Sequence, residues 1–439
     1  MIKPLLPLRL QDIDRESLRV YLKDTWSLSD MLYNSIVNEE AMYSALDPLR
    51  HPLIFYLGHN PVFYINKLRQ AGLLLNPIDS HFESIFASGV DPASADEIDK
   101  SIQWPKLEKV KKYIETVRQT LIHSIDLMDL CDISFDSKVW SLLMSMEHER
   151  IHFETSSVLI RQCPINFLKK PEGVRYASCS DNVPDLEFIQ FKGQDVRLGN
   201  NDNYPYYGWD NEYGDLVVAT KTFEISNRLI SNKEFLGFVQ DYGYKKEKYW
   251  SKDGWRWKSR AKKTSPLFWI ESNGQYKYRA MYDVIDLPLD WPAEVNYHEA
   301  KAFCAWKDWQ YRLPVEAEYQ VMQNHCLNAN SEEPFNQNLN LNIANFSPTS
   351  VVRHNIHGVY DLFGNVWQWL EDEFYPLPGF ESHSLYEDFS KPYFTKEHKM
   401  IKGGSWATTG TAMCKSYRLW FRKHFYQHAG FRIIRELNL

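Results

Sequence analysis

Apolar residues recur at helical spacing through the first 170 residues and predict four helices. The four stripes cover residues 18–36, 52–68, 105–130 and 136–162, and Asp136 is expected to cap the last of them. Residues 76–104, which include Pro77, Gly89 and Pro92, predict a long connection between the second and third helices. Four helices with one long crossover loop are typical of a four-helix bundle.

The pattern changes after Pro171, where strands become short and turns become frequent. Of the 15 tryptophans, 3 precede this point and 12 follow it. Helical stretches are expected only at residues 231–242, 297–309 and 315–323. The sequence therefore predicts an α+β protein with a helical domain at 1–170 and a second domain at 171–439.

Two histidines in the fourth helix are the first candidates for chemistry. His148 and His152 lie four residues apart, which places both imidazoles on one face of a helix. The neighbouring Glu149 and Glu154 favour a metal site, because carboxylates commonly orient ligating imidazoles. The structural alternative is one histidine satisfied in the core and one exposed.

His59 in the second helix is the candidate for a third ligand. It follows Gly58, which allows another backbone to approach closely, and it lies among apolar neighbours. Alone, such a histidine is more often structural. A bundle with two facing imidazoles, however, needs inward ligands from another helix to complete a site.

The same stretch satisfies the H-E-x-x-H pattern, which leaves a zinc hydrolase open as an alternative. In that interpretation Glu149 is the general base. The pattern is short and arises by chance, and the longer Gly-x-x-His continuation does not follow His152.

Composition limits the partners. The chain has 50 basic and 57 acidic residues, a formal net charge of −7, and no basic run longer than a few residues, so nucleic acid is not expected. The amino terminus lacks the apolar core of a signal peptide, and no stretch approaches a membrane span. Six cysteines without a compact pairing pattern favour reduced thiols and a cytoplasmic location.

The second domain resembles the formylglycine-generating-enzyme (sulfatase-modifying factor) fold, a variant of the C-type lectin fold. The resemblance rests on motifs in the order of that family, at residues 227–235, 292–297, 311–318, 364–369, 403–406 and 430–432. The first domain resembles a DinB-like four-helix bundle, whose three metal-binding histidines match His59, His148 and His152.

This pair of domains is similar to the non-haem iron sulfoxide synthases of ergothioneine and ovothiol biosynthesis. Residues 50–59, 147–157 and 421–432 favour the 5-histidylcysteine sulfoxide synthases of the ovothiol branch. The resemblance implies that sulfur of L-cysteine is joined to the imidazole ring of L-histidine while O2 oxidises the sulfur. Three imidazoles leave coordination positions open, and Fe(II) suits oxygen chemistry whereas zinc has no redox chemistry.

Two alternatives remain beside this expectation. The ergothioneine branch, which uses trimethylhistidine and often a γ-glutamylcysteine donor, shares the same scaffold. A lectin-like binding module on a helical scaffold, without catalysis, is the other. Metal analysis is expected to separate iron, zinc and no metal.

Two departures from these families change the expected chemistry. Many ovothiol-type synthases continue into a methyltransferase domain, whereas this sequence ends at Leu439, so methylation is expected to fall to another protein. Formylglycine formation needs paired cysteines near the carboxyl end, and only Cys414 lies there.

The resemblance also implies roles for residues near the carboxyl end. It aligns Tyr417 with a catalytic tyrosine of the ovothiol branch, where a phenol beside iron biases coupling over sulfinate formation. Arg422, His424 and Gln427 are the candidates for binding substrate carboxylate or amine groups. The substrates are expected to bind between the two domains.

Overall fold

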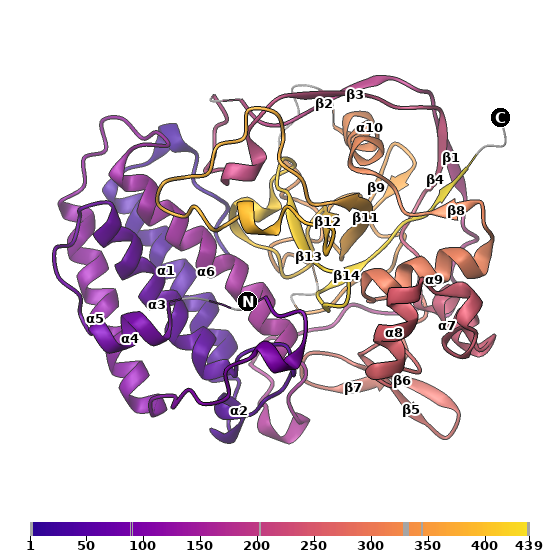
Figure 1. The fold of residues 1–439 in the computed structure, drawn as a ribbon, viewed down its shortest axis with the longest axis horizontal. Helices are drawn as coiled ribbons and strands as arrows, with labels where there is room; N and C mark the ends of the chain where they lie inside the picture. The colour runs from indigo at the N-terminus through magenta and orange to yellow at the C-terminus, as the bar shows by residue number, and fades with distance from the viewer. Residues whose placement is uncertain are drawn as a thin grey trace.

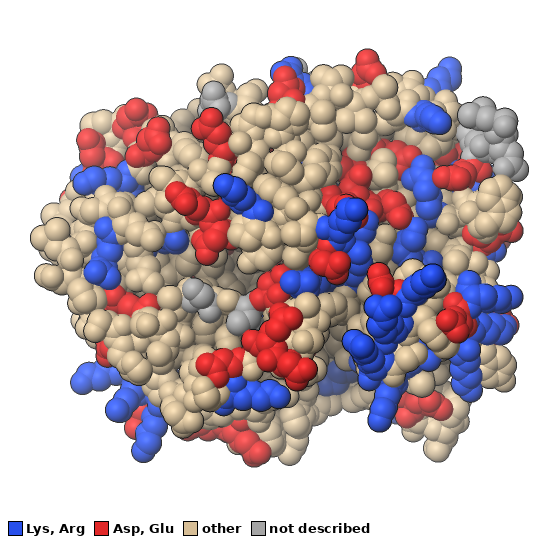
Figure 2. All heavy atoms as spheres, viewed as in Figure 1, with Lys and Arg blue, Asp and Glu red and all other residues tan. Residues whose placement is uncertain are grey.

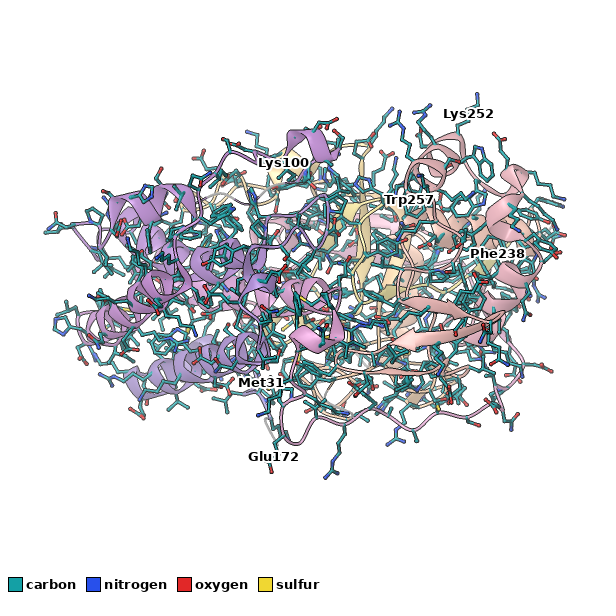
Figure 3. All side chains as sticks on the ribbon, turned by 90° about the horizontal axis from the view of Figure 1, so that it is seen from below. Met31, Lys100, Glu172, Phe238, Lys252 and Trp257 are labelled. Atoms are coloured by element: carbon teal, nitrogen blue, oxygen red, sulfur yellow. The ribbon has the colours of Figure 1, made fainter. Side chains whose placement is uncertain are left out.

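The computed structural model describes residues 3–87, 89, 91–201, 203–327, 333–343 and 346–436 of the 439-residue chain. A helical part formed by the first third of the chain lies beside a larger part of small sheets and short helices (Figure 1). A view turned by 90° shows the same arrangement, with side chains filling the junction between the two parts (Figure 3). The predicted mixture of helix and sheet is confirmed.

Four long helices form the helical part, as the apolar stripes predict. They are α1 (Arg15–Asn34), α3 (Leu53–Gln70), α5 (Leu107–Asp126) and α6 (Lys138–Ile160). Both α1 and α3 contact α5 and α6, so the four helices close around one core. The closer likeness to a DinB bundle stays a prediction.

The predicted long connection separates α3 from α5, and it contains the short helix α4 (Ser80–Ile85) and a 3-10 turn, η2 (Ala95–Glu97). The predicted N-cap of α6 is wrong. Ser137, not Asp136, occupies the N-cap position of α6, and no side chain caps that helix end. The remaining short elements here are η1 (Leu10–Asp12), α2 (Glu40–Tyr43) and η3 (Ile165–Phe167).

Helix α6 is buried on all sides, which explains its sequence. Of its 23 residues, only Lys138, Ile151 and His152 are not fully buried. A helix covered on every face has no solvent-facing polar stripe, so its polar side chains must find partners in the protein. Helix α6 packs against α1 and α3 on one side and against η8 (Gly410–Met413) of the second part on the other.

Acidic side chains of α6 reach across the junction. Glu147 accepts a hydrogen bond from the Thr411 backbone N–H at 2.6 Å. Gly410, with φ +68°, makes room for this carboxylate, because a Cβ there would overlap Glu147. Glu154 accepts hydrogen bonds from Trp367 Nε1 at 2.7 Å and Thr408 Oγ1 at 2.8 Å. Helix α6 is therefore part of both halves of the fold.

Two four-stranded sheets form the centre of the second part. One has the order β1 (Phe188–Phe191), β4 (Phe223–Ser226), β15 (Ile434–Arg435), β8 (Tyr311–Arg312) and is antiparallel. The other has the order β13 (Leu419–Arg422), β12 (His398–Lys402), β11 (Trp367–Glu373), β14 (Ala429–Gly430), with β11 and β14 parallel. Two smaller ribbons pair β2 (Asp195–Leu198) with β3 (Leu216–Ala219) and β9 (Asn355–Ile356) with β10 (Val359–Tyr360). A three-stranded sheet consists of β5 (Trp269–Ser272), β6 (Gln275–Arg279) and β7 (Val284–Asp286).

Short helices surround these sheets. The three predicted helical stretches are confirmed as α7 (Asn232–Gln240), α9 (Tyr297–Lys307) and α10 (Glu316–Cys326), whereas α8 (Lys252–Arg260) was not predicted. The 3-10 turns are η4 (Asp210–Glu212), η5 (Gly243–Lys245), η6 (Glu247–Tyr249) and η7 (Lys391–Tyr393).

Lys and Arg side chains gather over the region of α8 on the face shown in Figure 2. None of the helices that the structure describes has both the length and the apolar character needed to cross a membrane.

Candidate metal centre

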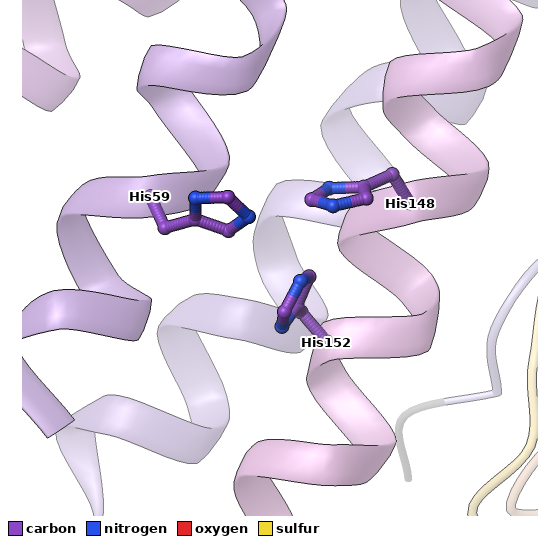
Figure 4. Close-up of side chains that lie close together, drawn as sticks. All are labelled: His59, His148 and His152. Atoms are coloured by element: carbon purple, nitrogen blue, oxygen red, sulfur yellow. The ribbon is translucent and has the colours of Figure 1, made fainter. Parts of the chain in front are cut away.

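Three histidines from two helices meet inside the bundle. His59 lies on α3, and His148 and His152 lie one turn apart on α6. One ring nitrogen of each lies within 4.8 Å of the others, and the ring centroids are 4.4–5.0 Å apart. Figure 4 shows the three rings directed toward one shared space between the helices. The structure thus brings together the three residues that the sequence singles out.

A backbone carbonyl fixes the orientation of His59. Its Nδ1 donates a hydrogen bond to the Phe86 carbonyl at 2.7 Å, which leaves the Nε2 lone pair free for a ligand. Gly58 permits this contact, because a Cβ there would lie 2.7 Å from the Phe86 ring. The expected close approach at Gly58 is real, but an aromatic ring makes it rather than another backbone.

His148 and His152 are held by packing rather than by carboxylates. The His148 ring stacks on Phe63, with centroids 3.7 Å apart and planes 5° apart. The Nδ1 atoms of both histidines are buried and have no hydrogen-bond partner among the described residues. Glu149 and Glu154 bind other groups, so the prediction that they orient these imidazoles is wrong.

The environment keeps all three imidazoles uncharged. Burial lowers the pKa of His59 to about 4. Burial, followed by the neighbouring histidines, holds the pKa of His148 well below its usual value, and burial and His59 do the same for His152. Metal binding requires neutral imidazole, so three nitrogen donors are available at neutral pH without deprotonation.

Glu149 faces away from the histidines. Its carboxylate accepts hydrogen bonds from Ser29 Oγ at 2.7 Å and from the Tyr64 hydroxyl at 2.9 Å. It lines a cavity of about 30 Å³ whose other walls come from α1, α3 and α5, and none of the three histidines lines that cavity. A general base must reach the reacting group, so this geometry does not support the zinc hydrolase.

We expect Glu149→Gln to leave metal content unchanged and turnover within about twofold of the parent. Glutamine keeps the size and one acceptor oxygen, and the changed atom lies outside the histidine cluster. Loss of a true general base lowers rates by about 10²–10⁴-fold. Steady-state rates and metal analysis of the purified variant measure this. A rate loss of about 10²–10⁴-fold would restore the hydrolase interpretation.

Tyr417 lies in the segment between η8 and β13. Its side chain is buried, and its hydroxyl has no hydrogen-bond partner among the described residues. Its ring lies 5.9 Å from the Trp367 ring, and Trp367 donates to Glu154 on α6. Lys402 Nζ donates to the Tyr417 carbonyl at 2.8 Å and fixes the backbone. The phenol is therefore buried beside a tryptophan that is hydrogen-bonded to α6, and its hydroxyl has no partner among the described residues.

The three predicted substrate residues have different environments. Arg422 Nε already donates to Asp91 Oδ2 at 3.0 Å, so its charge is neutralised inside the protein. His424 Nε2 and Gln427 Nε2 are buried and have no partner among the described residues. Burial also lowers the pKa of His424 to about 4. Of the three, His424 and Gln427 have buried polar atoms without a partner among the described residues.

Some residues near the centre were missed from the sequence. Lys67 lies four residues after Phe63 and eight after His59, so the helical stripe of α3 was the available signal. Tyr386 lies in the connection between β11 and β12, and its ring centroid is 6.2 Å from that of His148. No local pattern predicts a contact between a loop and a helix more than 200 residues apart.

Residues 185–437 match the family described as "Sulfatase-modifying factor enzyme 1-like domain". The chain belongs to this family. Formylglycine formation would need a reactive thiol near the carboxyl end. Cys414 is free and buried, and burial holds its pKa well above the usual value.

Curated relatives resemble the whole chain, including the bundle. It is 26% identical over 443 residues to "Ergothioneine biosynthesis protein 1" of Schizosaccharomyces pombe, covering 92% of this chain and 54% of the relative. It is 27% identical over 399 residues to "Hercynine oxygenase" of Mycobacterium tuberculosis, covering 85% of this chain and 88% of the relative. It is 25% identical over 400 residues to "Hercynine oxygenase" of Mycolicibacterium thermoresistibile, covering 85% of this chain and 84% of the relative. The chain thus spans about half the length of the first of these relatives.

Proposed function

We propose that this protein is an Fe(II)- and O2-dependent sulfoxide synthase that joins the sulfur of L-cysteine to the imidazole carbon of L-histidine. The buried cluster of His59, His148 and His152 carries the proposal. One cysteine, one histidine and one O2 give one 5-histidylcysteine sulfoxide and one water. An S–H and a C–H bond are replaced by a C–S bond, and one oxygen atom goes to sulfur.

Iron fits the donors that the chain offers. Three neutral imidazoles leave coordination positions for substrate and O2, and nitrogen ligands suit iron. Iron(II), when bound, would supply the electrons that activate O2, which zinc does not. Relatives named oxygenases support an O2-using reaction. They do not name this chain's metal.

The protein's own residues would bind, orient and exclude water. The bundle, which we assign to residues 1–170, keeps three imidazoles neutral and fixed. The remainder, 171–439, would supply Tyr417 and the polar atoms of His424 and Gln427. Holding two substrates in a near-attack arrangement lowers the barrier more than any single contact does.

The names of the relatives favour a second candidate, a synthase of the ergothioneine type acting on trimethylhistidine. The two candidates are separated by product analysis. The full-length protein is loaded anaerobically with iron(II), given air, and offered cysteine or γ-glutamylcysteine together with histidine or trimethylhistidine. Mass spectrometry should show the cysteine–histidine sulfoxide as the main product. A dominant trimethylhistidine product would establish the second candidate, and no coupled product from any pair would overturn both.

We expect Tyr417→Phe to retain the fold and the iron while releasing more cysteine sulfinate relative to coupled sulfoxide. The substitution removes only the hydroxyl, which has no structural partner among the described residues and is free to deliver a proton during coupling. The ratio of the two products, measured by mass spectrometry, tests this. Tyr319→Phe is a matched control, since that buried hydroxyl donates to the Leu362 carbonyl instead. An unchanged ratio at an unchanged rate would leave Tyr417 with a packing role.

A further inference from the structure

Lys67 is a buried cation beside the histidine cluster that forms no ion pair among the described residues, although the charge of Asp388 acts on it. Its side chain is largely buried, and among the described residues no carboxylate forms an ion pair with it. Its Nζ donates to the Leu385 carbonyl and to Gln70 Oε1 at 3.3 Å. An ammonium has three N–H donors, so one remains unused.

Aromatic rings connect Lys67 with the metal centre. The Nζ atom lies 5.0 Å from the centroid of Phe63, which stacks on His148, and 4.3 Å from the centroid of Tyr386. The charge acts on the cluster directly, because it contributes to lowering the pKa values of His59 and His148. Burial lowers the pKa of Lys67 itself to about 8, so the ammonium form still predominates at neutral pH.

Arg50 is a second cation, on the His152 side of the cluster. Its guanidinium carbon lies 4.9 Å from the centroid of Tyr56, whose ring is 5.9 Å from that of His152. Its Nε donates to the Tyr56 hydroxyl at 2.8 Å. Arg50 is partly exposed and, within the described residues, forms no ion pair with a carboxylate, although the charge of Asp47 acts on it. Its charge contributes to the low pKa of His152.

Three arginines near the junction are paired with carboxylates, whereas the buried Lys402 and Arg279 donate only to backbone carbonyls within the described part of the chain. Arg150 pairs with Asp24 at 2.6 Å, Arg161 with Glu294 at 2.8 Å, and Arg422 with Asp91 at 3.0 Å. An unpaired buried charge is costly, so it is retained where a ligand completes it. Lys67 and Arg50 differ from Lys402 and Arg279 because each lies over an aromatic ring next to a cluster histidine, Lys67 on the His148 side and Arg50 on the His152 side.

We propose that Lys67 and Arg50 bind the α-carboxylates of the two amino-acid substrates, one each, on opposite sides of the histidine cluster. This inference rests on the proposed function, because it requires two amino acids at the centre. It replaces Arg422 as the expected carboxylate-binding residue. It also explains why the α3 stripe continues from a metal ligand through an aromatic ring to a buried lysine.

Paired ligands that differ only in the carboxylate provide the test. Binding of L-cysteine against cysteamine, and of L-histidine against histamine, is measured by calorimetry on full-length protein loaded with iron(II) without O2. The parent should prefer each amino acid by roughly 10- to 100-fold, the range of a hydrogen bond to a charged group. Lys67→Gln should remove the preference for one pair, and Arg50→Gln the preference for the other.

Controls separate charge from folding. Lys67→Arg keeps the charge and should keep most of the preference, and Lys111→Gln, an exposed lysine on α5, should change nothing. Iron content must equal that of the parent in every variant. If both glutamine variants keep both preferences, as when carboxylates bind the metal directly, the assignment is wrong. If the iron-loaded parent binds neither amino acid, the proposed function itself fails.

Discussion

Replacing His148 with glutamine is expected to abolish iron binding and turnover together while leaving the metal-free fold intact. Losing residues that merely orient a ligand lowers metal affinity by about 10–100-fold, so losing the ligand itself should cost at least about 100-fold. The metal-free protein should lose little, because the His148 Nδ1 has no partner among the described residues and stacking on Phe63 holds only the ring. The same loss of iron and turnover is expected at His59 and His152, although His59→Gln also loses the hydrogen bond to the Phe86 carbonyl.

Thermal unfolding distinguishes this result from misfolding. Iron that binds only the folded state should raise the melting temperature of the parent and not that of His148→Gln. Iron content after anaerobic loading and desalting provides the direct measurement. His51→Gln is the matched control: His51 is also buried, beside α3, and contacts Phe55 and Trp104 rather than the cluster. Full iron and normal turnover in any of the three ligand variants would contradict the three-histidine site.

Local periodicity was enough to predict the four long helices and the shared face of His148 and His152. The stripes of α1 and α5 are one-sided because those helices face both core and solvent, whereas 14 of the 18 residues of α3 are buried. The spacing of His148 and His152 fixes their common face through helix geometry alone. The third ligand on α3 followed from the need of a bundle for inward ligands, and the structure places His59 beside the other two.

The orientation of the neighbouring carboxylates was predicted incorrectly, although helix geometry contained the answer. Consecutive residues on a helix point about 100° apart, so Glu149 cannot share the face of His148. It turns toward Ser29 on α1 and Tyr64 on α3. Because α6 is buried all round, its three carboxylates take their partners from different neighbouring helices and loops.

Contacts across the junction could not be predicted from the sequence. Lys67 donates to the carbonyl of Leu385. The Glu147 carboxylate lies against Gly410, which belongs to a turn 263 residues later in the chain. Such contacts depend on how two separately folded patterns pack, and neither pattern contains that information. The same packing decides that Arg422 pairs with Asp91, whereas Lys67 forms no ion pair among the described residues.

The largest stability effect is expected from Arg161→Met at the end of α6. Arg161 is fully buried, donates from Nη1 to both Glu294 oxygens at 2.8 Å, and donates from Nε to the Arg279 carbonyl at 2.6 Å. Burial alone would raise the pKa of Glu294, but Arg161 and His428 lower it to about 2. Removing one partner leaves a buried charge uncompensated, which costs about 3–5 kcal/mol.

Urea unfolding monitored by tryptophan fluorescence measures this loss, and Lys170→Met is the control. Lys170 pairs with Asp283 at the same 2.8 Å, but 38% and 42% of the two side chains are exposed, so about 1 kcal/mol or less is expected. Equal effects of the two variants would mean that the buried pair contributes nothing beyond a surface contact. Since Arg161 joins the metal-site helix to the second part, its loss should also lower iron retention. Retained iron together with a large loss of stability would show that the centre depends on the bundle alone.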